Sequence, residues 1–323
     1  MSGETVRLGE RRVLAPEPAS TSPADSIVAR FGPELALLTV VGFWSSTFIV
    51  TKAVYAEISP LAFLFARFAL MCFLAFGVLL VRRRGAERRI KRRDLGRFAA
   101  AGATGYTLYQ LGFALGLDRT SPFSSALLIA MVPLITVLIL AMSGESTPLQ
   151  GWVGLAIAVT GTIVFLADKR GAEGTLVGDL LSLGAAFAFA IYGIVNRPLV
   201  ARYPMETWTA YAVLIGSIPL FLISGPAAIE QDWGALSVWT WVGIVYVVVF
   251  PVYVAYMLWN WGIARRGAAK ATSFSLLVPI VSGVLSALIF GEGFGPLKLI
   301  GAALVIAGVV TVRARRFSRR GGV

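Results

Sequence analysis

The most constraining feature of this sequence is the separation of its charged residues from a series of long apolar runs. Hydrophobic residues make up 57% of the 323 residues and charged residues 14%, whereas soluble domains contain roughly 45–50% and about 25%, respectively. A soluble core cannot hide so much apolar surface. Most runs reach the roughly 20 apolar residues that a helix needs to cross the hydrocarbon core of a bilayer. The sequence therefore predicts an integral membrane protein.

Ten membrane spans are predicted along the chain, which makes the expected fold class an all-α membrane protein. The last span is short, which suggests a tilted neighbour or a locally thinner bilayer. The predicted spans are 35–51, 60–81, 98–117, 123–142, 149–167, 180–198, 207–223, 241–263, 271–290 and 297–312.

The positive residues predict the orientation of these spans. Lysine and arginine accumulate in short cytoplasmic loops, and most of the 29 in this chain fall on one side if the N-terminus is cytoplasmic. Ten spans then place both termini in the cytoplasm. Basic clusters beside membrane helices bind anionic lipid, so the net charge of +12 does not call for nucleic acid as a partner.

The chain lacks residues that several classes of protein function require. The chain has no histidine and a single cysteine, Cys72, so we expect no metal site, no cofactor and no histidine-based catalysis. Neither a phosphate-binding GxxxxGK[ST] loop nor a GxSxG nucleophile motif occurs in the sequence. The first 30 residues lack the apolar centre of a signal peptide. We therefore expect a non-enzymatic membrane protein with a disordered cytoplasmic N-terminal tail.

The two halves of the chain resemble each other when one is shifted by about 146 residues. Each half then holds five spans, and because five is odd, the second half must enter the bilayer from the opposite side. Such inverted repeats are typical of transporters that expose a midplane site to each side in turn. The matched pairs are Trp44 with Phe189, Lys52 with Arg197, Pro60 with Pro204, Gly116 with Gly262, Arg119 with Arg265, Pro133 with Pro279, Gly144 with Gly291, Glu145 with Glu292, Gly154 with Gly301, and Gly161 with Gly308.

Four segments, 44–52, 59–67, 133–145 and 279–292, resemble the drug/metabolite transporter superfamily in its EamA-type branch. The resemblance covers about residues 35–312. It implies ten helices and export of small metabolites, such as amino acids or related compounds, across a bacterial plasma (inner) membrane. One departure is Tyr211, which occupies in the second half the place of Arg67, so no second buried cation is expected.

The predicted organisation has five parts. The sequence does not distinguish a monomer from a homodimer. The parts are a disordered cytoplasmic N-terminal tail (1–33), a first EamA-like five-helix repeat (34–168), a linker (169–179), a second, inverted EamA-like repeat (180–313) and a basic cytoplasmic tail (314–323).

Arg67 is the most unusual polar residue within a predicted span. It follows Pro60 by seven residues, which places it about 10 Å into the membrane. An arginine at the bilayer centre costs about 2.5–3.5 kcal/mol on insertion scales, so another group must compensate it. Arg67 is either a counter-charge for a substrate carboxylate or gating partner, or a structural residue satisfied by carbonyl groups or by reaching the interface.

Aromatic and small polar residues recur in the first, third, fourth, sixth, eighth and ninth spans, which by resemblance surround the family's central cavity. Tyr253, Tyr256 and Asn260 have the spacing of one helix face. A cavity with aromatic walls and a few polar groups suits a small organic solute. Alternatively, the hydroxyl residues only permit helix packing and the aromatic residues lie at the interfaces. The candidate cavity residues are Trp44, Ser45, Thr47, Arg67, Tyr106, Tyr109, Gln110, Tyr192, Asn196, Tyr253, Tyr256, Asn260 and Ser273.

Pro133 and Pro279 fall in the middle of predicted spans and should kink them. They are candidate hinges, or alternatively fixed elements of helix shape. The glycine pairs of the fifth and tenth spans are expected to allow close helix packing. Glu145 and Glu292 are expected as caps or turn anchors.

The predicted function is therefore secondary transport of a small-molecule substrate, most simply export, by alternating access. A channel or receptor is the main alternative, and it would not need inverted halves. An intramembrane enzyme would need a nucleophile, an acid and a base close together within the bilayer, and the sequence offers no such set.

Overall fold

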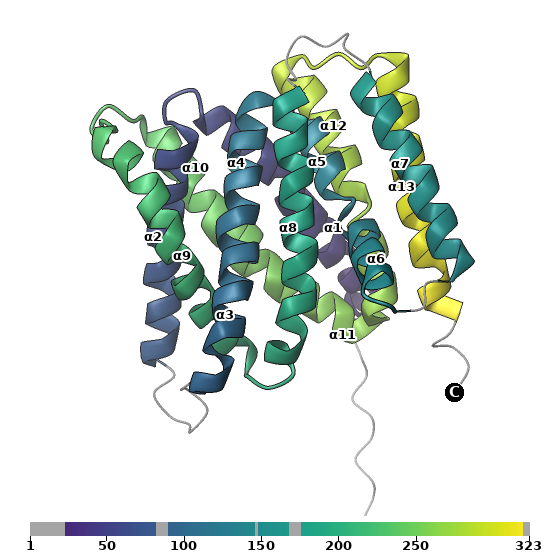
Figure 1. The fold of residues 1–323 in the computed structure, drawn as a ribbon, viewed down its shortest axis with the longest axis horizontal. Helices are drawn as coiled ribbons and strands as arrows, with labels where there is room; N and C mark the ends of the chain where they lie inside the picture. The colour runs from purple at the N-terminus through teal and green to yellow at the C-terminus, as the bar shows by residue number, and fades with distance from the viewer. Residues whose placement is uncertain (1–22, 82–89, 146–147, 168–175, 319–323) are drawn as a thin grey trace, which may run out of the picture.

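The fold is known from a computed structural model, which describes residues 23–81, 90–145, 148–167 and 176–318. These ranges contain helices and connecting turns but no strand, and the helices stand side by side (Figure 1). The elements are α1 (Pro23–Val54), α2 (Pro60–Val81), the 3-10 turn η2 (Arg92–Asp94), α3 (Leu95–Gly102), the π-helical turn η3 (Ala103–Leu108), α4 (Tyr109–Arg119), α5 (Pro122–Ile129), α6 (Val132–Met142), α7 (Leu149–Ala167), α8 (Leu176–Val200), α9 (Met205–Glu230), α10 (Val238–Val248), the π-helical turn η4 (Val249–Val254), α11 (Ala255–Phe274), α12 (Leu277–Phe290) and α13 (Pro296–Ser318).

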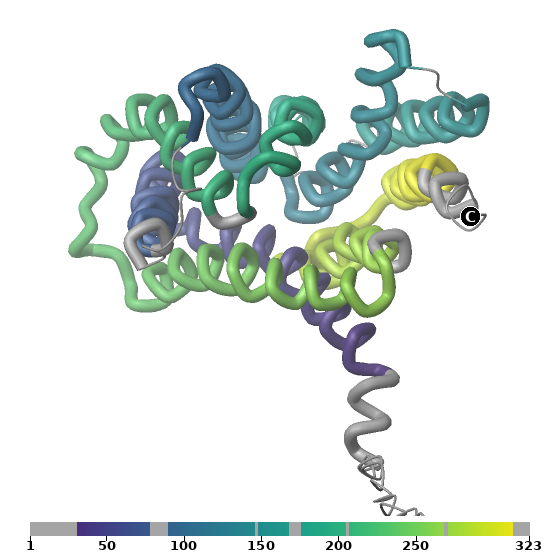
Figure 2. Tube along the Cα trace, turned by 90° about the horizontal axis from the view of Figure 1, so that it is seen from below, coloured from purple at the N-terminus to yellow at the C-terminus, as the bar shows by residue number. Residues whose placement is uncertain are grey.

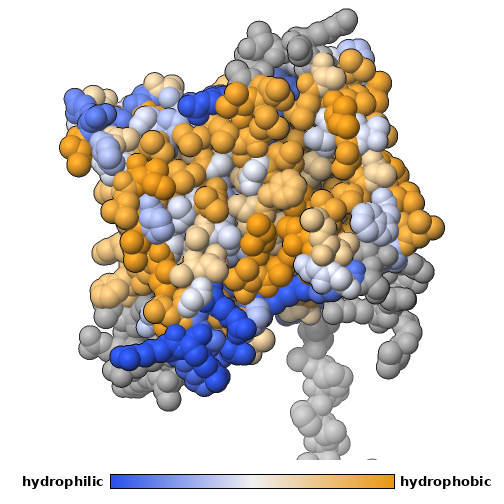
Figure 3. Space-filling view, viewed as in Figure 1, coloured by the Kyte–Doolittle hydropathy of each residue, from blue (hydrophilic) through white to orange (hydrophobic). Residues whose placement is uncertain are grey.

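The outer surface confirms a multi-pass membrane protein. Within the described ranges, eight helical segments are long and apolar enough to cross a membrane, and Pro296–Val312 is a shorter apolar helix. A broad apolar band separates hydrophilic ends in the space-filling view (Figure 3). The predicted third span is a continuous helical run through α3, η3 and α4. It is not among the eight, because its glycine and polar residues lower its mean hydropathy.

Several predicted boundaries were wrong because helices continue beyond the apolar runs. α1 begins at Pro23, so part of the tail that we expected to be disordered is helical. α8 begins at Leu176, within the predicted linker, and α13 continues to Ser318, so the last helix is longer than expected. The remaining parts of the predicted tails, loop and linker, at 1–22, 82–89, 168–175 and 319–323, lie outside the described residues.

The long helices of each half pack against helices of the other half. α1 lies against α11 and α12, and Figure 2 shows the purple α1 beside the light-green α11. In the same way, α8 packs on α4, α5 and α6. We call α1, α11 and α12 the α1 module, and α4, α5, α6 and α8 the α8 module. Two further pairs are α2 with α9 and α7 with α13, while α3 packs on α8 and α9, and α10 packs on α1 and α2.

Glycines allow the closest of these helix contacts. On α7, a Cβ at Gly154 would lie 2.8 Å from the carbonyl oxygen of Gly308, and a Cβ at Gly161 would lie 2.8 Å from that of Gly301. Any side chain at these positions would push α7 and α13 apart. The prediction that these four glycines serve helix packing is confirmed.

Two kinds of interruption recur at matching places in both halves. The π-helical turns η3 and η4 lie about 146 residues apart; such wide turns are rare and are frequent at functional sites. A short break separates α5 from α6, and another separates α11 from α12. Pro133 and Pro279 lie in the first turns after these breaks, and their role as hinges stays a prediction.

Candidate functional site

A π-helical turn positions the first residue of the candidate site, Tyr106. Its ring meets the ring of Tyr192 on α8 edge to face, with 5.8 Å between centroids. Tyr192 itself lies against Gly105, where an added Cβ would collide with its ring. The turn η3 thus brings a tyrosine and a glycine to the same face, and α8 approaches closely as a result.

Further aromatic rings extend this contact into a continuous wall. Phe189 lies 5.4 Å from Tyr192 and 4.8 Å from Tyr109 between ring centroids. Tyr109 in turn stacks with Phe113, at 6.2 Å. The wall therefore crosses from η3 to α8 and back to α4, entirely within the helices that carry the predicted cavity residues.

The second half contributes Tyr256 from α11 to the same place. Tyr256 is close enough to interact electrostatically with Tyr106, Tyr109 and Tyr192, and Tyr253 interacts with Tyr106 in the same way. Ring contacts and electrostatic interactions thus link all five predicted tyrosines. Tyr253 lies within η4, so the α-helical spacing that we used to place it beside Tyr256 does not apply there.

Arg67 lies beside this wall as a buried cation with few partners. Its side chain is 6% exposed, and Nη1 donates a hydrogen bond of 3.2 Å to Oε1 of Gln110. Nε is buried without an acceptor among the described residues. Tyr109 and Tyr55 are within electrostatic range. The guanidinium is thus held by a neutral amide, which leaves donors available to another acceptor.

The candidate residues of α1 make mostly helix contacts. Trp44 packs on Trp259 at 5.1 Å between centroids, and its Nε1 donates to the carbonyl of Pro251 in η4. The hydroxyl of Ser45 donates to the carbonyl of Val278 on α12, while that of Thr47 donates within α1 itself. For Ser45 and Thr47, these bonds favour the packing interpretation over a cavity.

The remaining candidates differ in their surroundings. Asn196, at the far end of α8, is 7% exposed, and its Oδ1 is buried without a hydrogen-bond donor in the described part of the chain. Asn260 and Ser273 on α11 are exposed. Their assignment to the cavity stays a prediction.

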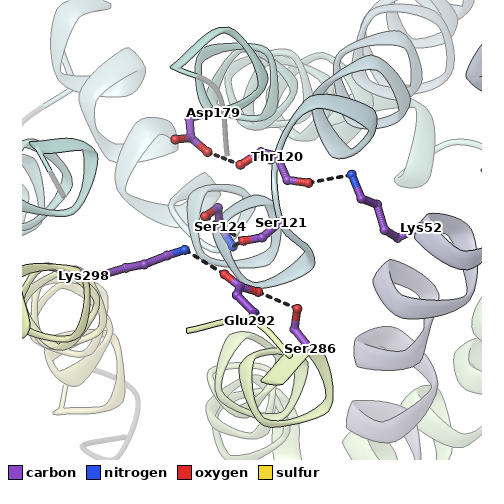
Figure 4. Close-up of polar contacts among 8 residues, drawn as sticks. All are labelled: Lys52, Thr120, Ser121, Ser124, Asp179, Ser286, Glu292 and Lys298. Carbon is purple, nitrogen blue, oxygen red and sulfur yellow. Dashed lines mark hydrogen bonds and ion pairs between the residues drawn. The ribbon is translucent and has the colours of Figure 1, made fainter. Parts of the chain in front are cut away.

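A polar cluster at one end of the bundle was missed by sequence reasoning (Figure 4). Lys52 Nζ donates to the carbonyls of Leu117, Asp118 and Thr120. The hydroxyl of Thr120 donates to Asp179 at the start of α8, at 2.6 Å. The signal available in the sequence was the match of Lys52 with Arg197, together with an acidic residue at the start of a span.

The same end holds a buried ion pair. Lys298 Nζ lies 2.7 Å from Oε1 of Glu292, whose other oxygen accepts a hydrogen bond from Ser286. Lys298 also lies over the ring of Phe123, at 5.8 Å. Glu292 therefore anchors the turn between α12 and α13, as predicted, whereas Glu145 is exposed.

The opposite end is rich in arginine and is organised around Asp94. This carboxylate is 1% exposed; it accepts a hydrogen bond from Tyr203 and pairs with Arg202 at 2.7 Å. The hydrogen bond from Tyr203 and the charge of Arg202 hold the pKa of Asp94 below its ordinary value. At the same end, Arg266 pairs with Glu34 at the start of the membrane part of α1.

Comparison with known proteins gives two matches to one family. Residues 32–167 and residues 176–314 each match the EamA-like transporter family. A probable terminal-alkyne amino-acid exporter of Streptantibioticus cattleyicolor is 32% identical over 72% of this chain and 78% of that protein. A probable amino-acid metabolite efflux pump of Escherichia coli is 27% identical over 85% of this chain and 92% of that protein. A solved crystal structure, 19% identical, covers 90% of this chain and 99% of its own with a TM-score of 0.55, which shows a shared fold.

Proposed function

Because the chain belongs to the EamA-like transporter family and is thus a membrane transporter of small molecules, we propose that it exports amino acids or related metabolites by alternating access. The observation that carries this proposal is the convergence of tyrosines from both halves, Tyr106 and Tyr109 on one side and Tyr192 and Tyr256 on the other. A site shared between two halves can open to either side when the halves move. The amino-acid class is suggested by the names of the two efflux relatives.

We further propose that the chain has ten spans arranged as two inverted repeats. The two family matches support this arrangement, as do contacts that recur with their partners exchanged. Gly154 faces Gly308 and Gly161 faces Gly301, and a shift of about 147 residues turns the first contact into the second. Only a two-fold axis between α7 and α13 would relate the contacts in this way.

A second recurring contact supports the same arrangement. Asp179 at the start of α8 bonds Thr120, which lies just after α4. Glu34 in α1 pairs with Arg266 on α11, and these are the positions reached by shifting Asp179 and Thr120 by about 146 residues. The two contacts lie at opposite ends of the bundle, as inverted halves would require.

The orientation that we propose places the arginine-rich end, and with it both termini, in the cytoplasm. The basic residues around Asp94 support this orientation under the positive-inside rule. The membrane would then be a bacterial plasma membrane, with anionic lipid against the cytoplasmic arginines. Lys52 and Glu292 would lie at the outer end.

Within this site, we propose that Arg67 binds the carboxylate of the substrate. A buried guanidinium held by a neutral amide is stabilised by an anionic partner, and arginine donates two parallel hydrogen bonds to a carboxylate. Tyr109, which interacts with Arg67 and belongs to the aromatic wall, would connect the carboxylate site to the rings that hold the apolar part.

Flux into inverted membrane vesicles tests the transport proposal. Vesicles from cells that overproduce the protein should take up one class within a panel of radiolabelled amino acids, with a rate that saturates with concentration. Vesicles from cells without the protein are the control. A rate that rises linearly to high concentration would favour a channel, and uptake of no amino acid in the panel would contradict the proposed substrate class.

A further inference from the structure

We propose that Lys52 is the outer gate residue of this transporter and that Arg197 is its counterpart at the cytoplasmic end. In this state Lys52 fastens the two modules together at the outer end; in the alternate state Arg197 would fasten them at the cytoplasmic end. The inference rests on the alternating-access function proposed above and adds to it the residues that hold each state.

The contacts of Lys52 match the hydrogen-bonding capacity of an ammonium group. Nζ lies 2.9 Å from the carbonyl oxygen of Leu117, 2.8 Å from that of Asp118 and 3.1 Å from that of Thr120 (Figure 4). These carbonyls belong to the last turn of α4 and to Thr120 just after it, where no further helical N–H is available and the helix dipole favours a cation. All three N–H donors of the ammonium group thus have acceptors.

These bonds join the α1 module to the α8 module, and the two modules must move apart at the outer end during alternating access. Lys52 is on α1, in the α1 module, whereas α4 belongs to the α8 module. α1 also packs on α5, next to the carbonyls that Lys52 binds. Opening of the outer end would move α1 away from α4, and all three bonds of Lys52 would break.

Arg197, the corresponding residue at the cytoplasmic end, does not connect the two modules in this conformation. Arg197 is the match of Lys52 in the second half; its side chain is exposed on α8 and forms no hydrogen bond or ion pair with any residue that the structure describes. The carbonyls that match those bound by Lys52 are those of Ile263, Ala264 and Arg266. They precede Gly267, whose φ of 82° interrupts the helix, so the end of a helix is available there too.

The two residues lie at opposite ends of the bundle. Asp179, at the start of α8, bonds Thr120 beside Lys52, so Arg197 near the end of α8 must lie at the far end. The packing between the two modules also differs at the two ends. α1 packs on α4 and α5 more extensively than α8 packs on α11 and α12. The conformation is that of a transporter closed outside and less closed toward the cytoplasm.

A reporter cysteine within the tyrosine cluster can test this gate without knowledge of the substrate. Tyr256→Cys, in a background in which the native Cys72 is changed to serine, provides a single thiol between the halves. A membrane-impermeant maleimide is applied either to intact cells, which exposes the outer side, or to inverted vesicles, which exposes the cytoplasmic side. The rate of modification from each side then reports how often that side is open.

If Lys52 and Arg197 act as the two gates, their methionine variants should change the outside labelling rate in opposite directions. Lys52→Met should raise the labelling rate from outside about tenfold, the change produced by about 1.4 kcal/mol, and lower it from the cytoplasmic side. Arg197→Met should lower labelling from outside, and because Arg197 is exposed, this variant should fold normally. Lys52→Arg, which keeps a cation for the carbonyls, should label like the reference protein.

Three results would overturn the proposal. In the first, Lys52→Met leaves the outside rate unchanged while the reference reporter reacts from both sides, which makes Lys52 a fixed helix cap. In the second, Lys52→Met and Arg197→Met shift the rates in the same direction. In the third, the reporter reacts from the same single side in every variant. This result would contradict alternating access, and therefore also the proposed gate.

Discussion

Gly161 and Gly301 face each other with no room for a side chain between them. A Cβ on Gly161 would lie 2.8 Å from the carbonyl oxygen of Gly301, and a Cβ on Gly301 would lie 2.7 Å from that of Gly161. The backbones of α7 and α13 are therefore in direct contact at this level. Dispersion contacts between the two backbones replace the side-chain interdigitation found in most helix pairs.

Gly301→Leu should force α13 away from α7. Overpacking of a close contact typically costs about 1–3 kcal/mol, so we expect a corresponding fall in the free energy of unfolding, measured by denaturation in detergent micelles. Gly184→Leu is the matched control, because a Cβ on Gly184 meets no atom within 4 Å. Equal effects of the two variants would show that the contact is not tight.

Arg67→Gln should weaken transport of a carboxylate-bearing substrate. Hydrogen bonds to charged groups contribute about 1.5–3 kcal/mol, so kcat/KM for an amino acid should fall by about 10- to 100-fold. Transport of the corresponding amine, which lacks the carboxylate, should change much less. The comparison of amino acid with amine separates a binding role from a structural role, since a structural defect would lower both rates.

Arg119→Gln is the control for Arg67→Gln. Arg119 ends α4, its side chain is 44% exposed, and it pairs locally with Asp118. We expect normal transport of both solutes by this variant. Normal transport of the amino acid by Arg67→Gln would instead reduce Arg67 to a structural residue.

The stability of the arginine-rich end should depend on pH through Asp94. The pKa of Asp94 is lower in the folded protein than in the unfolded chain. In the unfolded chain, the pKa of an aspartate is about 3.9. The unfolded chain therefore binds the proton more tightly, and the stabilisation is complete above about pH 5. We expect it to disappear as the pH falls through the folded-state pKa, as measured by thermal unfolding across that range.

Tyr203→Phe should reduce this dependence on pH. The variant removes the hydrogen bond that contributes most to lowering the pKa of Asp94, so less stabilisation would remain to be lost in acid. Tyr211→Phe is the matched control, since both tyrosine rings pack on Phe98 but the hydroxyl of Tyr203 donates to Asp94. Identical acid profiles for the two variants would contradict this account of Asp94.

Lys298→Met should leave the carboxylate of Glu292 buried without its cation. The two side chains are 11% and 4% exposed, and breaking a buried pair costs about 3–5 kcal/mol. The double variant Lys298→Met with Glu292→Gln should recover part of the lost unfolding free energy. For Arg119→Met, which breaks an exposed pair, we expect a loss of about 1 kcal/mol or less; a similar loss for Lys298→Met would contradict strong burial.

The sequence predicted the membrane class, the family and most helices, because apolar runs and charge segregation are local properties of the chain. Among the candidate cavity residues, Tyr106, Tyr109, Tyr192 and Tyr256 interact electrostatically in the structure, whereas their role in binding substrate stays a prediction. Helix ends were harder to predict: α1 and α8 begin in polar segments, where no apolar boundary marks the first turn.

The polar clusters around Lys52 and Asp94, at the two ends of the bundle, could not be predicted from residue type alone. From the sequence, Lys52 was named only as the match of Arg197, because its partners are three main-chain carbonyls and every residue has one. Asp94 reaches Tyr203 across a long separation in the chain. The two π-helical turns have no distinctive residue composition, so the place of Tyr253 within η4 became visible only in three dimensions.

The two π-helical turns also bear on the history of the protein. Each turn takes up one residue more than an α-helical turn, and η3 and η4 occupy the same place in their respective halves. The simplest explanation is that a single insertion preceded the gene duplication that produced both halves. Under the inverted-repeat arrangement proposed above, the ancestor would be a five-helix chain that already carried the wide turn and assembled as an antiparallel pair.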